Sequence, residues 1–163
     1  MPAMASARPR GFNDRLIDDF RAHGGQITSG PFTGRSLLLL TTTGAKTGEE
    51  RTSPLAYSRD GDRFVIVASK GGAARNPAWL HNLRAHPDVS VELGADRFRA
   101  RASVPDEAER RRLYDAHAAK MPAFAEYEKK TARKIPVVVL ERISLEELAR
   151  KRGWWESNPR PRP

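Results

Sequence analysis

Two glycine-containing loops, each placed directly after an apolar run, constrain this sequence more than any other feature. The first loop, at 43–51, reads TGAKTGEER and follows the leucine run at 37–40. The second loop, at 69–72, reads SKGG and follows the apolar run at 64–68. Glycine lets the backbone turn sharply and approach a ligand closely, while free N–H groups and cationic side chains attract anions. We therefore predict two buried strands whose following loops form one groove for a phosphorylated, multiply anionic molecule.

The order of the remaining elements favours an antiparallel α+β fold. Turn signals at 59–62 (RDGD) and 94–96 (GAD) join neighbouring strands as hairpins. A doubly wound parallel fold is disfavoured, because the early strands lack crossover helices between them. We predict an antiparallel sheet or barrel of about six strands with peripheral helices. The predicted strands are 36–42, 52–58, 63–68, 88–93, 97–103 and 135–140, and the predicted helices are 11–23, 76–85, 105–120, 122–132 and 144–151.

Length and composition bound the organisation of the chain. With 163 residues, 39% of them hydrophobic, the chain can bury the core of one domain. We expect a flexible N-terminus at 1–10, a single domain at 11–152, and a disordered tail rich in proline and arginine at 153–163. The absence of cysteine excludes disulfides and thiolate chemistry. No secretory signal is found, and no apolar stretch approaches the roughly 20 residues of a bilayer span, so a cytoplasmic protein is expected.

The net charge of +9 raises the alternative of a basic nucleic-acid-binding module. The cations, however, are spread along the chain in short runs such as 110–112 and 150–152, which are typical of solvated helix faces. Attraction to an acidic cofactor, or loose association with an anionic membrane surface, accounts for such a charge as well. We therefore expect no nucleic-acid partner, and we allow a peripheral location at the inner face of the membrane.

Few side chains are arranged for catalysis by the protein itself. His81 and His86 are separated by five positions, which does not match a helical metal pair, so no metal site is predicted. No nucleophile-elbow pattern is present. Met121, Phe124 and Tyr127 form a stripe at helical spacing, which is either core or the wall of an apolar substrate pocket.

Three segments resemble the deazaflavin-dependent nitroreductase family, whose members use coenzyme F420. They are LLLLTTTGAKTGEERTSPLAY at 37–57, DGDRFVIVASKGGAARNPAWLHNL at 60–83 and IPVVVLERI at 135–143. The resemblance extends from about Phe12 to Ile143 and implies a split β-barrel related to FMN-binding oxidoreductases. Members that activate nitroimidazoles carry several tyrosines around the acceptor, whereas here only Tyr127 of the aromatic stripe keeps a hydroxyl and position 56 is alanine. A quinone or a similar flat acceptor is therefore favoured.

The resemblance also implies the site residues. Lys46 and Arg51 would take the phosphate and carboxylates of the coenzyme, and Pro54 and Leu55 would hold its ring through backbone contacts. Ser69 and Tyr127 are the implied catalytic side chains, the tyrosine by positioning the acceptor. The implied substrate pocket is Met121, Phe124 and Tyr127. The implied cofactor contacts are Ala45, Lys46, Thr47, Arg51, Thr52, Ser53, Pro54, Leu55, Ala56, Val67, Ala68, Ser69, Lys70, Gly71, Gly72, Ala78, Trp79, Leu80, His81 and Asn82.

Together these features predict an F420H2-dependent oxidoreductase that transfers a hydride from reduced deazaflavin to a quinone, nitroaromatic or enone acceptor. Three alternatives stay open at this point: an FMN-binding oxidoreductase on the same barrel, a deazaflavin-binding protein without catalysis, and the basic nucleic-acid-binding module. The resemblance implies a homodimer, because split barrels often dimerise.

Overall fold

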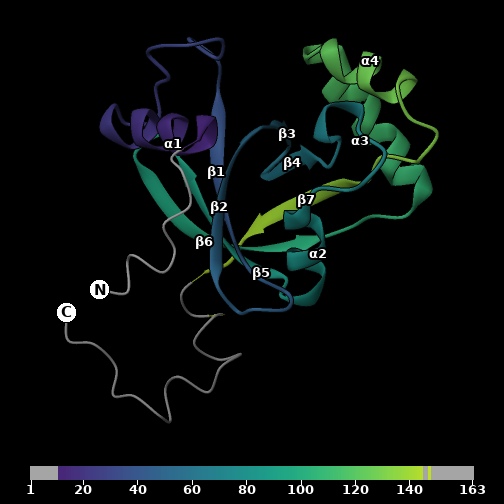
Figure 1. Ribbon diagram of the computed structural model, residues 1–163. Helices are drawn as coiled ribbons and strands as arrows, with labels where there is room; N and C mark the ends of the chain where they lie inside the picture. The colour runs from purple at the N-terminus through teal and green to yellow at the C-terminus, as the bar shows by residue number, and fades with distance from the viewer. Residues whose placement is uncertain (1–10, 145–146, 148–163) are drawn as a thin grey trace.

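A computed structural model of the protein describes residues 11–144 and 147 (Figure 1). All of its strands belong to one antiparallel sheet, and the helices pack around that sheet. The helices are α1 (Phe12–Ala22), α2 (Ala78–Ala85), α3 (Glu107–Lys120) and α4 (Ala123–Lys129), with a short 3-10 turn, η2 (Lys70–Gly72). The strands are β1 (Leu37–Thr43), β2 (Glu50–Ala56), β3 (Ser58–Asp60), β4 (Arg63–Val67), β5 (Asp88–Leu93), β6 (Asp96–Ser103) and β7 (Val137–Arg142). The predicted α+β class with an antiparallel sheet is confirmed.

The sheet curls into a barrel because two strands that adjoin in the sequence lie at its opposite edges. The strand order is β2-β1-β5-β6-β7-β4-β3, yet only Tyr57 separates β2 from β3. One residue spans less than 4 Å, so the two edges must lie close together. The predicted continuous strand at 52–58 is therefore wrong at Tyr57, and the sheet has seven strands where about six were predicted.

The uninterrupted apolar runs are strands that are covered on both faces. In β1, Leu38 and Leu40 face the barrel interior, while Leu37 and Leu39 pack with α1. None of the four is more than 5% exposed. Strands β4 and β7 follow the same rule, since alternate residues face the interior and the others pack towards α3 and α4. A strand that is buried on both faces has no polar positions, and this is why no alternation is seen there.

Strand β6 alternates because protein covers only its inner face within the described residues. Phe98, Ala100 and Ala102 point inward, and arginines occupy the positions between them. Arg99 donates to Ser90 Oγ at 2.7 Å across the sheet. This outer face is the solvated, charged surface that an amphipathic strand predicts.

The basic run at 110–112 is not the free solvated face that its composition predicts. Arg110 is only 7% exposed and donates to the carbonyl oxygen of Ile135 at 2.9 Å. Arg111 pairs with Glu128, and Arg112 pairs with Glu109 and with the β3 carboxylate of Asp60. The run therefore fastens α3 to the sheet and to α4, and its charge is largely neutralised within the domain.

Several predictions concern residues outside the described part of the chain. These are the N-terminus at 1–10, the domain end at 152, the tail at 153–163, and most of the helix at 144–151. Of that helix only Ser144 and Glu147 are described, and the Glu147 N–H donates to Ser144 Oγ at 3.0 Å, as expected for an N-cap. Within the described ranges no helix is long and apolar enough to cross a bilayer. The cytoplasmic location stays a prediction.

His117 is a titratable group in the packing between α3 and the sheet. It is fully buried, its Nδ1 lies 2.8 Å from Ser58 Oγ, and its ring meets Phe124 edge-on at 4.4 Å. Its Nε2 has no hydrogen-bond partner among the described residues. Burial, and then the charge of Lys120, lower the pKa of His117 to about 4. The imidazole is therefore neutral in the folded protein at neutral pH.

We expect the protein to lose stability as the pH falls from about 6.5 to about 4, because the unfolded chain then binds a proton on His117 that the folded chain does not. The free energy of unfolding should fall by roughly 3 kcal/mol across this window. Chemical denaturation at several pH values measures it, with His117→Gln as a polar control that does not titrate. Equal pH slopes for the two proteins between about pH 4 and pH 6.5 would contradict the assignment, since the carboxylates titrate alike in both proteins and their contribution cancels.

Candidate functional site

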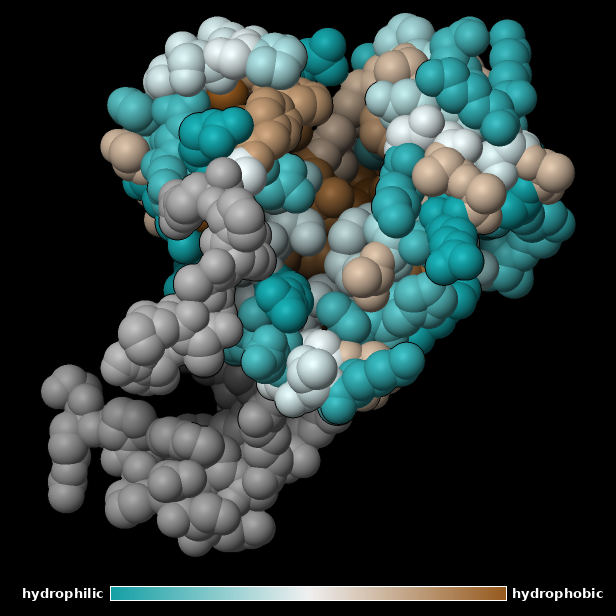
Figure 2. Space-filling model, in the orientation of Figure 1, coloured by the Kyte–Doolittle hydropathy of each residue, from teal (hydrophilic) through white to brown (hydrophobic). Residues whose placement is uncertain are grey.

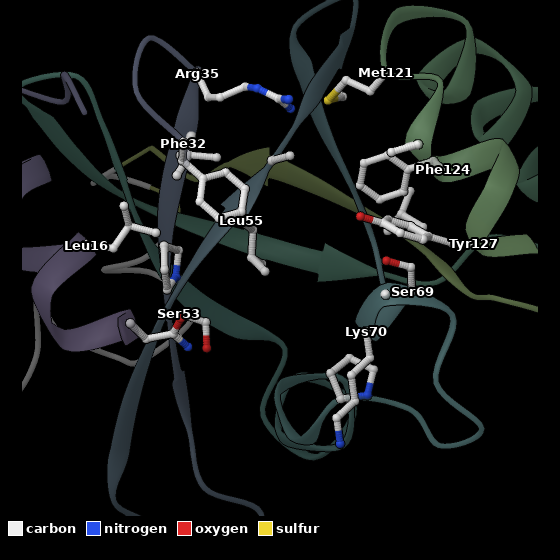
Figure 3. A pocket seen from close by; sticks show the side chains of 18 of the residues that line it. Leu16, Phe32, Arg35, Ser53, Leu55, Ser69, Lys70, Met121, Phe124 and Tyr127 are labelled. Atoms are coloured by element: carbon white, nitrogen blue, oxygen red, sulfur yellow. The ribbon is translucent and has the colours of Figure 1, made fainter. Parts of the chain in front are cut away.

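Two adjoining cavities open on the face where the two glycine loops lie. The apolar cavity, of about 730 Å³, lies between α1 and α4. The loop cavity, of about 920 Å³, is lined by the β1–β2 loop and by α2. Asn13, Ser53 and Trp79 line both, so the two form one groove. Figure 2 shows its hydrophobic floor between the two lobes of the molecule, and Figure 3 shows the apolar cavity from close by.

The groove joins the two predicted loops. Lys46 lines the loop cavity and Lys70 lines the apolar cavity, so both cations face the same continuous hollow. The curl of the sheet produces this arrangement, because it brings the ends of β1 and β4 to one face. The predicted single groove is therefore present in the structure.

Asn82 fixes the first loop from the neighbouring helix α2. Its Oδ1 accepts a hydrogen bond from the Ala45 N–H at 3.0 Å, and its Nδ2 donates to Thr42 Oγ1 at 3.1 Å. The side chain is 9% exposed, so both bonds are sheltered from water. Asn82 was predicted as a cofactor contact, and the structure adds that it positions the loop.

Gly44 makes the first loop tight. Its N–H donates to the Glu49 carbonyl oxygen at 2.7 Å, and a Cβ at this position would lie 2.6 Å from Thr47 Oγ1. Only glycine fits without a shift of that hydroxyl. The loop therefore closes at its base and presents the exposed residues 45–47 towards the loop cavity.

The cations of the first loop remain available to a ligand. Lys46 is exposed, and Arg51 reaches Glu49 at 3.2 Å in an ion pair whose side chains are both more than half exposed. Exposed pairs of this kind contribute little, at most about 1 kcal/mol. An anion in the loop cavity can therefore replace Glu49 on Arg51, and a guanidinium can bind phosphate or carboxylate with two hydrogen bonds.

Strand β2 forms the wall between the two loops. Ser53, Pro54, Leu55 and Ala56 line the apolar cavity. Because β2 lies at the end of the strand order, its outer backbone groups have no strand partner within the described residues. An edge strand tolerates a proline, and its free N–H and C=O groups can bind a flat heteroaromatic ring.

Arg133 holds the second loop at three points. It donates to the carbonyl oxygens of Ser69 at 2.7 Å and Ala73 at 2.8 Å, and to Asn76 Oδ1 at 2.7 Å. These bonds span η2 from end to end. The helix predicted at 76–85 begins at Ala78 and has no side-chain cap, and the amide oxygen of Asn76 accepts from Arg133 instead.

The backbone of the second loop is unusual. Lys70 has φ +48°, and Gly71 and Gly72 follow with φ +65° and +85°. The left-handed region costs a lysine roughly 1 kcal/mol or more, so the surroundings must hold it there. A Cβ at Gly72 would lie 2.9 Å from Lys130 Cβ and 3.0 Å from the Tyr127 carbonyl oxygen. Glycine at this position thus lets α4 approach the loop closely.

Helix α4, with Met121 just before it, supplies the predicted aromatic wall. Met121, Phe124 and Tyr127 are half-buried and line the apolar cavity, with the two rings edge-on at 5.2 Å. Tyr114 anchors the helix, because its hydroxyl donates to the Phe124 carbonyl oxygen at 2.6 Å. The stripe was predicted to be either core or pocket wall, and it is both, since Phe124 and Tyr127 also pack against the buried cluster beneath them.

The opposite wall of the apolar cavity was not predicted. It comes from α1 and the loop after it, through Phe12, Leu16, Phe32 and Arg35 (Figure 3). The rings of Phe12 and Phe32 are 5.8 Å apart. The segment 11–23 was predicted as a helix, but nothing in its sequence indicated that the apolar side of α1 also borders a cavity.

The structure brings most of the predicted cofactor contacts to the groove. Val67, Ser69, Lys70, Gly71 and the β2 residues line the apolar cavity. The loop cavity is lined by Ala45, Lys46, Thr47, Arg51, Thr52, Ser53, Ala78, Trp79, His81 and Asn82. Three predicted contacts, Ala68, Gly72 and Leu80, line neither cavity. Ala68 and Leu80 have no exposed surface, because both belong to the core of the barrel.

Comparison with known proteins places the chain. The sequence model of the family described as F420H(2)-dependent quinone reductase matches residues 15–142, which include every strand from β1 to β7. The chain is similar to an F420H(2)-dependent quinone reductase of Mycobacterium tuberculosis (strain ATCC 25618 / H37Rv). The two are 47% identical over 108 residues, which are 64% of this chain and 72% of that protein.

Two solved structures have the same fold. One, an F420-H2 dependent reductase (FDR-A), has a TM-score of 0.61 at 38% identity and covers 66% of this chain and 95% of its own. The other is described as a domain-swapped dimer; its TM-score is 0.63 at 34% identity, over 78% of this chain and 96% of its own. The curled sheet is therefore a split β-barrel, as the resemblance implied.

We expect Arg133→Gln to loosen the second loop. Loss of the three hydrogen bonds should speed amide exchange at 69–76 several-fold and lower the free energy of unfolding by about 2 kcal/mol. Hydrogen–deuterium exchange measures the first effect and denaturation the second. Lys134→Gln is the matched control, because it removes a neighbouring cation whose side chain is 63% exposed and whose ion pair is with the exposed Glu107. Unchanged exchange at 69–76 in Arg133→Gln would show that Arg133 does not hold the loop.

Proposed function

The chain belongs to the F420H(2)-dependent quinone reductase family, and we propose that it uses reduced coenzyme F420 to reduce a quinone. One observation carries the proposal: a cationic, amide-lined cavity and an apolar cavity with aromatic walls form one groove. Such a groove suits a molecule with an acidic end and a flat ring, together with a second flat molecule beside that ring.

The donor set fits the coenzyme. Lys46, Arg51 and the amides of the first loop would hold its phosphate and carboxylates, as cations and free N–H groups do for anions. The outer edge of β2, at 53–56, would hold the ring. Ser69, which is only 5% exposed, borders the same cavity. When bound, the reduced deazaflavin supplies a hydride, which with one proton from solvent converts a quinone into a hydroquinone.

The protein contributes position rather than a nucleophile. Trp79 lines both cavities, and Tyr127 lines the apolar cavity from α4. We propose that Tyr127 and Ser69 orient the quinone with their hydroxyl groups, while Met121 and Phe124 cover its apolar face. Alignment of two bound reactants can lower a barrier by up to about 7–11 kcal/mol, so no further protein group is needed.

Three alternatives have less support. FMN would suit the same fold, but the named relatives use F420H2 and nothing in the comparisons points to FMN. A nucleic-acid-binding module is disfavoured because the basic run on α3 is paired within the domain. A binding protein without catalysis would share the groove, and only turnover separates it from the proposed enzyme.

We also propose that the protein acts as a homodimer. The support is the similarity to a solved structure described as a domain-swapped dimer, at 34% identity and with a TM-score of 0.63. The choice of a quinone over a nitroaromatic or enone acceptor rests on the family. Association with a membrane surface stays a prediction.

We expect the protein to oxidise reduced coenzyme F420 when menadione is added. Recovery of the fluorescence of the oxidised coenzyme reports the reaction, with protein-free and menadione-free mixtures as controls. Tight binding of the coenzyme without turnover for any quinone would reduce the function to a binding protein. A yellow flavin that remains bound through gel filtration would instead favour FMN.

Lys46→Ala combined with Arg51→Ala should weaken coenzyme binding about 30-fold, or about 2 kcal/mol, because both cations of the loop cavity are lost. A fluorescence titration measures the dissociation constant. Arg97→Ala combined with Lys129→Ala is the matched control: it removes the same charge from exposed positions that line neither cavity. Equal affinities for the two double variants would sink the assignment of the loop cavity to the acidic end of the coenzyme.

A further inference from the structure

The apolar cavity contains more positive charge than the predicted coenzyme contacts supply, because Arg35 and Lys120 are not among those contacts. Arg35, Lys70 and Lys120 line it, and none of the described residues that line it is Asp or Glu. Lys70 belongs to the second glycine loop and lies at one end of the cavity. Arg35 lies at the other end, where its guanidinium points across the opening towards Met121 (Figure 3). Lys120 precedes Met121 on that side.

Arg35 and Lys120 have no partners among the described residues that would neutralise their charge. Within the described part of the chain neither Arg35 nor Lys120 has a side-chain hydrogen bond or an ion pair, although all three arginines of α3 are paired. Both side chains are exposed. Their charge is therefore free to act on a molecule at the opening of the cavity.

The backbone at Arg35 and at Lys120 is held in place by local structure. The Arg35 N–H donates to the Phe32 carbonyl oxygen at 2.9 Å, and the Gly34 N–H donates to that of Ile27 at 3.1 Å, so the loop after α1 is pinned next to the aromatic wall. Lys120 is the last residue of α3, where the free carbonyl groups of a helix end favour a positive charge. The two cations thus approach the cavity from opposite walls.

We propose that Arg35 and Lys120 form a cationic rim that makes this acceptor subsite selective for flat quinones that carry an anionic substituent, such as a sulfonate or a carboxylate. The inference rests on the proposed function, because it names the class of acceptor that the same groove selects. The aromatic walls cover the ring, and the rim binds the substituent at the opening, where a planar guanidinium matches an oxyanion.

The rim also suits the charge that develops during the reaction. A quinone that accepts a hydride gains two electrons and one proton, so one oxygen carries a negative charge until a second proton arrives from solvent. Cations placed before the reaction stabilise such a charge without reorganisation. Because both side chains are exposed, salt should weaken their effect on either charge.

The test compares two acceptors of the same ring size, 1,4-naphthoquinone-2-sulfonate and uncharged menadione, with reduced coenzyme F420 at low salt. The measured quantity is kcat/KM for the sulfonate divided by kcat/KM for menadione. Intrinsic reactivity cancels when the ratio for a variant is divided by that for the wild type. Arg35→Gln and Lys120→Gln should each lower the ratio several-fold in favour of menadione, and the double variant about tenfold. Arg35→Lys, which keeps the positive charge, should retain most of the wild-type ratio.

Two controls keep the outcome decisive. The first control is Arg97→Gln combined with Lys129→Gln, which changes the net charge as much as the rim double variant does. Neither residue lines a cavity, so the ratio should stay as in the wild type. High salt should reduce the ratio in the wild type and change it little in the double variant. An unchanged ratio in Arg35→Gln with Lys120→Gln, or an equal drop in the charge control, overturns the proposal.

A binding measurement separates this proposal from the proposed function. If the protein does not turn over menadione, calorimetry with naphthalene-2-sulfonate, which cannot be reduced, still tests the rim. The wild type should bind it about tenfold more tightly than the Arg35→Gln, Lys120→Gln double variant. Equal affinities would contradict the proposed cationic rim. A tenfold loss of affinity in the double variant, without turnover of any quinone, would support the rim and contradict the proposed reductase activity.

Discussion

Helix α2 links the two glycine loops, because it holds the first by hydrogen bonds and follows the second after a short connection at 73–77. Trp79, Leu80 and Leu83 bury its apolar side in the end of the barrel, and each such side chain contributes roughly 1.5–3 kcal/mol. Residues 73–77 connect the second loop to the helix, and Asn82 on the helix holds the first loop by two hydrogen bonds. The separation of the two cationic loops therefore depends on α2 for the first loop and on Arg133 for the second, and together they set the geometry of the groove.

Much of this arrangement could be predicted from local patterns. The apolar runs before each loop identified β1 and β4, and the glycines identified the turns that follow them. The predicted strand at 52–58 was wrong only at Tyr57, where the chain leaves one sheet edge for the other. That division could not be predicted, because it depends on which distant strands pair with each half. The cofactor contacts came from the resemblance, and the structure brings all but three of them to the groove.

The residues that the sequence could not reveal act over long distances. Arg133 lies in a basic stretch that composition assigns to solvent, yet it holds a loop some sixty positions earlier. Arg110 also lies in a basic run, yet it is buried and donates a hydrogen bond to the carbonyl oxygen of Ile135, which is distant in the sequence. The wall formed by α1 lies across the cavity from α4, and no local pattern links the two. In each case the side chain acquires its role only when the sheet curls.

The central claim is that both loops bind the same molecule at the same time. Hydrogen–deuterium exchange during a titration with coenzyme F420 tests it directly, if the peptides that cover 43–51 and 69–72 are followed separately. The structure predicts that protection of the two segments rises together, with one midpoint, because a single ligand spans the groove. Protection of one segment alone, or midpoints that differ by about tenfold or more, would contradict it.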